Sequence, residues 1–144
     1  MDVVALLLGH ASTMLNSTVN IVDDRGLTPL HWAVSKGCAG VVALLLNCPG
    51  INVNETDERE ETALHLACYA IRLDPDILRK LLTHPDIDPN VKRFGDGRTP
   101  IMLLLQRNYN IDEKEHCLRA MVESNRVDLE VKDAHGLSLN DMAW

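Results

Sequence analysis

The hexamer Val-Val-Ala-Leu-Leu-Leu occurs twice in this chain, at residues 3–8 and again at residues 41–46. An identical hexamer is very improbable by chance in 144 residues, so internal duplication is the first hypothesis. A second alignment supports it, because residues 45–54 and 81–90 share leucines, a proline, an isoleucine and an asparagine at one constant offset. Repeated units of this size stack on their neighbours instead of closing around one core.

A third register consists of four short segments that each begin with a hydroxyl residue, at Thr28, Thr62, Thr99 and Ser138. In the first segment the threonine hydroxyl can cap a helix. The proline after it suits the first helical position, where a missing amide hydrogen has no partner to lose. Apolar residues follow at helical spacing until Gly37, so the sequence predicts a short helix that ends at this glycine.

A second helix is predicted over residues 39–47, where valines and leucines form a broad apolar face that only a neighbouring repeat can cover. Pro49 and Gly50 are expected to end this helix. The segments before the hydroxyl residues are polar and rich in turn formers, as at residues 23–26 and 133–136. We therefore expect hairpin loops that project from the stack.

The order of these landmarks resembles the ankyrin-repeat family, whose unit of about 33 residues carries a Thr-Pro-Leu-His signature. Here the signature at residues 28–31 stands before Gly37, the apolar residues 41–45 and Asn54, in the family's order. The resemblance covers nearly the whole chain and implies an all-α solenoid of stacked helix pairs with projecting hairpin loops. The residues that match the family's structural motif are Thr28, Pro29, His31, Gly37, Thr62, His65, Thr99 and Pro100.

We expect a single ankyrin-repeat domain over residues 1–144. Its predicted units are a partial first repeat at 1–22, repeats at 23–56 and 57–92, a repeat with an insertion at 93–132, and a partial last repeat at 133–144. The first and last units begin and stop inside predicted helices, so the chain looks cut from a longer one. The face near Ala143 and Trp144 then needs a cover.

Several positions depart from the family's pattern. Glu60 and Ile71 stand where the family has glycine, and Met102 and Asp141 replace its histidine. We expect local deviations in those hairpins and turns. The segment 109–116 is longer than the family's tight turn, and residues 9–19 carry a similar excess. Such insertions usually form exposed loops that carry specificity.

Composition excludes several functions. The formal net charge of −7 disfavours nucleic-acid binding, because a surface that follows phosphates needs clustered lysine and arginine. A protein or peptide partner is expected instead, with a basic segment as one option. The apolar run at 3–8 follows Asp2 and is too short to cross a bilayer, so neither a signal peptide nor a membrane segment is predicted.

The four cysteines form no Cys-x-x-Cys pair and no zinc-binding spacing with histidine. We expect reduced thiols in an intracellular protein, cytoplasmic or nuclear, with no metal and no cofactor. No catalytic residue is predicted either. The family uses the histidines of its motif, here His31 and His65, to hydrogen-bond backbone between adjacent repeats. His116 and Cys117 resemble half of a thiol–base pair, but neighbours on a helix point about 100° apart.

The densest acidic patch comprises Asp57, Glu58, Glu60 and Glu61. It is either a solvated hairpin or an attraction for a basic peptide, which would speed encounter more than raise affinity.

The resemblance implies that partners contact the hairpin tips and the exposed side of the first helices, which line the concave face. Tyr69 and Arg107 are the expected hot spots, because tyrosine and arginine concentrate binding energy. Phe94, at a hairpin edge, fits a surface or a core role equally well, and Trp32 is assigned to packing between helices. The partner-binding residues carried over are Asp24, Arg25, Leu27, Lys36, Glu58, Arg59, Glu61, Tyr69, Asp96, Arg98, Gln106 and Arg107.

The leading hypothesis is a non-catalytic protein-interaction module, as a fragment of a larger regulatory or scaffold protein. The alternative is a dedicated ankyrin-type inhibitor that masks a kinase or a transcription factor. An enzymatic role would require a catalytic domain elsewhere in the parent chain, because fold alone does not define function.

Overall fold

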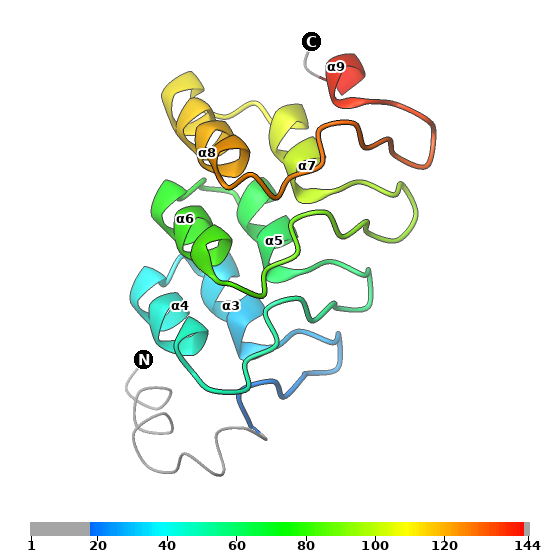
Figure 1. Ribbon diagram of the computed structural model, residues 1–144. Coiled ribbons are helices and arrows are strands. Elements are labelled where there is room, and N and C mark those ends of the chain that lie inside the picture. The colour runs from blue at the N-terminus through cyan, green and yellow to red at the C-terminus, as the bar shows by residue number, and fades with distance from the viewer. Residues whose placement is uncertain (1–17, 143–144) are drawn as a thin grey trace.

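The computed structural model describes residues 18–142, which form an all-α solenoid, as predicted. Figure 1 shows two columns of stacked helices, with hairpins projecting beside one of them. The column next to the hairpins contains α3 (Pro29–Ser35), α5 (Ala63–Tyr69) and α7 (Pro100–Gln106), and it ends at α9 (Leu139–Met142). The other column contains α4 (Ala39–Leu46), α6 (Pro75–Thr83) and α8 (Ile111–Glu123).

Some predictions fall outside the described residues. They concern the hexamer at 3–8, most of the longer segment at 9–19, and the face near Ala143 and Trp144. Within residues 18–142, no helix is both long enough and apolar enough to cross a membrane.

Helices α3 and α5 each begin with a reciprocal cap between a threonine and a histidine. The Thr28 Oγ1 accepts the His31 amide at 3.3 Å, while the Thr28 amide donates to His31 Nδ1 at 3.0 Å. Because Nδ1 accepts, the proton lies on Nε2, which donates to the Glu61 carbonyl of the next repeat at 3.0 Å. Thr62 and His65 repeat this arrangement, and His65 Nε2 reaches the carbonyl that precedes Thr99 at 3.2 Å.

The later repeats cap their first helices differently. In α7 the histidine position holds Met102, and Thr99 Oγ1 is buried without a hydrogen-bond partner among the described residues. The deviation predicted at Met102 is therefore a lost cap and a lost link to the next repeat. At α9 the carboxylate of Asp141 accepts both the amide and the hydroxyl of Ser138, at 2.8 and 2.9 Å. The Asp141 carboxylate therefore bonds to the residue before α9 as the motif histidine does before α3 and α5.

Three of the hairpins share one hydrogen-bond pattern. The amide of their first aspartate (Asp23, Asp57 or Asp133) donates to the carbonyl four residues later at 3.0 Å, and its carboxylate accepts two backbone amides. Glu60 takes a glycine position in this pattern with the same left-handed backbone, at φ 58° against 76° for Gly26. The deviation predicted at Glu60 is therefore wrong, although a left-handed non-glycine residue costs about 1 kcal/mol.

Backbone and asparagine hydrogen bonds connect successive repeats. Asn54 Oδ1 accepts the Asp88 amide at 2.7 Å, and its Nδ2 donates to the Asp86 carbonyl at 2.7 Å. Asn20 and Asn90 make the same pair of bonds one repeat earlier and one repeat later. The hairpins are joined by bonds from Glu58 N–H to Arg25 C=O (3.0 Å), Phe94 N–H to Arg59 C=O (2.9 Å) and Ala134 N–H to Asp96 C=O (2.8 Å).

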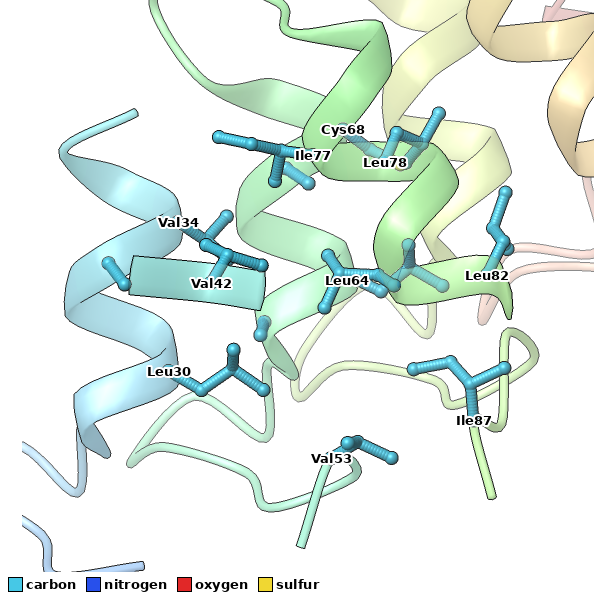
Figure 2. Close-up of a cluster of buried hydrophobic side chains, with 14 of the residues drawn as sticks. Leu30, Val34, Val42, Val53, Leu64, Cys68, Ile77, Leu78, Leu82 and Ile87 are labelled. Carbon is cyan, nitrogen blue, oxygen red and sulfur yellow. The ribbon is translucent and has the colours of Figure 1, made fainter. Parts of the chain in front are cut away.

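The apolar core runs along the stack between the two columns. Figure 2 shows side chains of α3, α4, α5 and α6 directed into this core, among them Leu30, Val42, Leu64 and Leu78. All four are at most 1% exposed. Helices of one repeat contact those of the next in both columns, so each pair covers the apolar face of its neighbour.

Replacing His65 by methionine, the residue that the third repeat carries at this position, should lower the free energy of unfolding by about 2 kcal/mol. The Thr62 amide and the Arg98 carbonyl both lose a buried partner. Equilibrium unfolding in urea measures the change. The matched control is His116→Met on the exposed surface of α8, which should change stability by less than about 0.5 kcal/mol. Equal effects of the two substitutions would contradict the role given to His65.

The stability of the fold should also depend on pH through His65. Burial holds the pKa of this imidazole below its ordinary value of about 6.5. The unfolded chain therefore binds the proton first, so stability is retained above about pH 6.5 and falls as the pH is lowered further. The His65→Met variant should lose this part of the slope. Urea titrations at a series of pH values decide the point, and equal slopes in both proteins would exclude His65 as the cause.

Candidate functional site

The hairpin face is the surface formed by the four hairpins and by the exposed sides of α3, α5 and α7 (Figure 1). The structure places the twelve residues of the predicted binding set at different depths in it. Asp24, Arg25, Lys36, Glu58, Arg59, Gln106 and Arg107 are exposed. Leu27, Tyr69, Asp96 and Arg98 are half-buried, and Glu61 is buried.

Trp32 is a surface residue, so the expectation that it packs between helices is wrong. Its side chain is 40% exposed, and its indole Nε1 donates to Asp23 Oδ2 at 3.1 Å. The guanidinium of Arg25 and the ammonium of Lys36 lie over the ring, 5.6 and 5.7 Å from its centroid. Lys36 follows Trp32 by one helical turn, so the two side chains lie on the same side of the helix. This spacing is a sequence signal from which the exposure of Trp32 could have been predicted.

The acidic hairpin contributes fewer free charges than its sequence suggests. The Glu61 side chain is 2% exposed and pairs with Arg93 at 2.8 Å, so the expectation that it lies on the surface is wrong. One carboxylate oxygen of Asp57 accepts the amides of Arg59 and Glu61. Only Glu58 and Glu60 of the predicted patch are exposed.

Tyr69 is tied to this buried ion pair. Its hydroxyl donates to Glu61 Oε2 at 2.6 Å, which holds the ring against the hairpin. Burial and then this hydrogen bond raise the pKa of the phenol above its ordinary range. Arg93 also pairs with Asp96, and the Asp96 Oδ2 lies 2.6 Å from the Arg93 Nη2. The pair therefore connects the second hairpin to the third, and Tyr69 offers only part of its ring to a partner.

Arg98 lies where the third and fourth hairpins meet. Its guanidinium contacts the carboxylates of Asp96 and Asp133, each at 3.6 Å, and donates to Gln106 Oε1 at 2.7 Å. The Asp133 carboxylate is buried, and its Oδ2 has no partner within hydrogen-bond distance in the described part of the chain. Arg98 therefore neutralises a buried charge as well as lying on the hairpin face.

Arg107 is exposed and lies over the ring of Tyr109, with 5.7 Å between the guanidinium carbon and the ring centroid. The Tyr109 hydroxyl donates to the Ala70 carbonyl at 2.6 Å, which anchors this ring to the preceding repeat. Phe94 is 73% exposed, so the surface role is the correct one of its two alternatives. Both residues extend the hairpin face toward its C-terminal end.

The segment 109–116 is largely helical, so the loop predicted for this insertion is wrong. The side chain of Asn110 accepts the Asp112 amide at 2.9 Å and caps α8, and the acidic first turn complements the helix dipole. Lys114 donates to the carbonyls of Leu105 and Arg107, at 2.7 and 2.9 Å. These bonds hold the added turn of α8 against the end of α7.

Two candidate kinds of chemistry can be tested against the described residues, a metal site and the pair of His116 and Cys117. Among them, no three histidine, cysteine or acidic side chains gather closely enough to hold a metal ion. Cys117 is fully buried, and burial raises the pKa of its thiol to about 11, while His116 on the same helix is exposed. A thiol that stays protonated at neutral pH is a poor nucleophile.

Replacing Arg93 by methionine should lower the free energy of unfolding by about 3 kcal/mol, because the Glu61 carboxylate stays buried without its counter-charge. Adding Glu61→Gln should recover most of the loss, since a neutral amide of the same size still accepts from Tyr69. The control is Arg119→Met, which removes only an exposed pair with Glu115. Urea unfolding of the four proteins tests the prediction, and a double variant no better than Arg93→Met would refute it.

The family model described as ankyrin repeats, in three copies, matches residues 1–93, which is more than half of the chain. An ankyrin repeat-containing protein of Schizosaccharomyces pombe is 34% identical over 83 residues, which cover 58% of this chain and 35% of the relative. Alpha-latrotoxin-Lh1a of Latrodectus hasselti is 32% identical over 123 residues, or 85% of this chain and 8% of the toxin.

A probable serine/threonine-protein kinase of Dictyostelium discoideum is 46% identical over 54 residues, or 38% of this chain and 6% of the kinase. The chain thus spans less than two thirds of the length of each of these relatives. The family model matches the region that carries the threonine–histidine caps described above. This chain belongs to the ankyrin-repeat family, whose repeats generally serve as non-catalytic modules of protein–protein interaction.

Proposed function

We propose that this chain is a non-catalytic module that binds a partner protein through the hairpin face, as part of a larger regulatory or scaffold protein. The observation that carries the proposal is the exposed Trp32 between the cations of Arg25 and Lys36. Tryptophan and arginine concentrate binding energy at interfaces. The hydrogen bond from the indole to Asp23 holds the ring in place before any partner arrives, so little entropy is lost on binding.

Other exposed residues extend this surface along the stack. Arg59 lies at the tip of the second hairpin, and Gln106 and Arg107 lie at the end of α7. Asp24, Leu27, Tyr69, Asp96 and Arg98 belong to the same face at lower exposure. Glu61 acts from below by positioning Tyr69, because its carboxylate is buried in the pair with Arg93.

The charge on the face is mixed. Glu58 and Glu60 are exposed on the second hairpin and would attract a basic segment of the partner, with Arg59 between them limiting the attraction. The proposal includes the repeat boundaries predicted above and an intracellular location, cytoplasmic or nuclear. The length of the relatives beyond the matched stretch supports a module within a longer protein.

Affinity capture from cells, with this chain as bait, tests the proposal. The double variant Trp32→Ala, Arg107→Ala should lose the captured partner, and titration calorimetry with the purified partner should give an affinity lower by about tenfold or more. The control is His116→Ala, Arg119→Ala on the exposed surface of α8, which lies in the other column. Circular dichroism verifies that both variants are folded. A partner that binds both variants as tightly as the native chain rules out the hairpin face.

A further inference from the structure

A pocket of about 590 Å³ lies between the end of α3 and the connection from α5 to α6. Its walls include apolar side chains of Val34, Ala67 and Ile77, and its edges include Lys36 and Arg72. Pockets that bind a ligand or a side-chain cluster typically measure about 300 to 1,000 Å³. Of the twelve residues in the predicted binding set, only Lys36 lines the pocket.

The pocket lies beside the departure predicted at Ile71. In the preceding repeat the chain passes from α3 to α4 through residues 36–38, with Gly37 in the left-handed conformation. In this repeat the connection runs through residues 70–74, and Ala70 leaves the helix with an extended backbone, at ψ 153°. The pocket lies between this longer connection and the end of α3.

Ile71 marks this connection as a contact surface. It is 93% exposed, whereas Leu73 two residues later is buried at 6%. An aliphatic side chain held almost entirely in water gains nothing for the fold, and its removal from water by a partner is favourable. The rim of the pocket therefore offers one exposed apolar side chain to a partner.

The charges at the rim define the complementary partner. Among the described residues, neither Lys36 nor Arg72 forms an ion pair, and both are exposed. The remaining charged residue of the lining is Asp74, whose Oδ1 accepts the amides of Asp76 and Ile77 as the cap of α6. The free charge around the pocket is thus positive in a chain with a net charge of −7.

The pocket also continues the hairpin face. Lys36 lines the pocket and lies over the ring of Trp32, at 5.7 Å from its centroid. A peptide that contacts Trp32 can therefore place its next residues at the pocket. A small free ligand fits less well, because the charged groups of the lining lie at its exposed rim or cap a helix.

We infer that this pocket takes an apolar side chain from an acidic segment of a partner protein, whose carboxylates face Lys36 and Arg72. The inference rests on the proposed function and gives it an anchor and a charge requirement. The apolar side chain contributes affinity by leaving water, and the carboxylates select the segment and speed its approach.

The probe is a phage-displayed library of random short peptides, selected on the folded chain. Enriched peptides should carry leucine, isoleucine, methionine or phenylalanine within two positions of an aspartate or glutamate. Fluorescence anisotropy then measures synthetic copies of the enriched peptides. Their affinity should fall by about tenfold for Arg72→Glu and for Ile71→Asp, which alter exposed side chains and place a carboxylate at the rim.

The matched control is Lys92→Glu, which makes the same change in net charge at an exposed lysine outside the pocket and should leave affinity unchanged. The inference is overturned by enrichment of basic or uncharged peptides, by no enrichment at all, or by equal losses in Arg72→Glu and Lys92→Glu. A captured partner that depends on Trp32 and Arg107 but not on Arg72 overturns the inference alone. One that depends on none of them overturns the proposed function too.

Discussion

No helix pair of this chain can bury its own apolar face, and the rest of the structure follows from that constraint. Val42 and Leu45 of α4 are at most 2% exposed because the next repeat covers them. The junction between repeats therefore has to be positioned accurately. His31 and His65 do this by capping their own helix and donating to the next hairpin with the same ring. Hairpin spacing, helix stacking and the binding face all depend on these junctions.

The fold could be predicted because its signals are local and periodic. Each repeat is specified by features within it, namely a threonine cap, a glycine such as Gly37 and an apolar second helix such as α4. The recurrence of these features along the chain predicts a stack of repeats. The site could be predicted only in outline. The burial of Glu61 depends on Arg93, which is 32 residues away, and no local pattern reveals that pairing. The segment 109–116 was expected to form a loop because it is longer than the family's turn, but most of it is helical. Asn110 caps this helix, and an asparagine at such a position is a signal that the sequence already contains.

The positions that depart from the repeat pattern have unequal consequences for function. Glu60 leaves its hairpin intact, since the backbone tolerates the left-handed conformation at a modest cost. Ile71 lies in a longer connection between helices, and a pocket lies beside it next to the hairpin face. Regular repeats build a common frame, and an individual protein acquires its own recognition surface where one repeat differs from the next.

Met102 has a consequence for the order in which the stack comes apart. Histidine rings hold the junctions from α3 to α5 and from α5 to α7, whereas at the next junction Thr99 Oγ1 has no hydrogen-bond partner among residues 18–142. Local opening follows missing contacts, and among the described junctions the one between α7 and α9 lacks the histidine link. We therefore expect the described part of the solenoid to open first at this junction, with slower amide exchange in the repeats that carry Trp32 and the pocket.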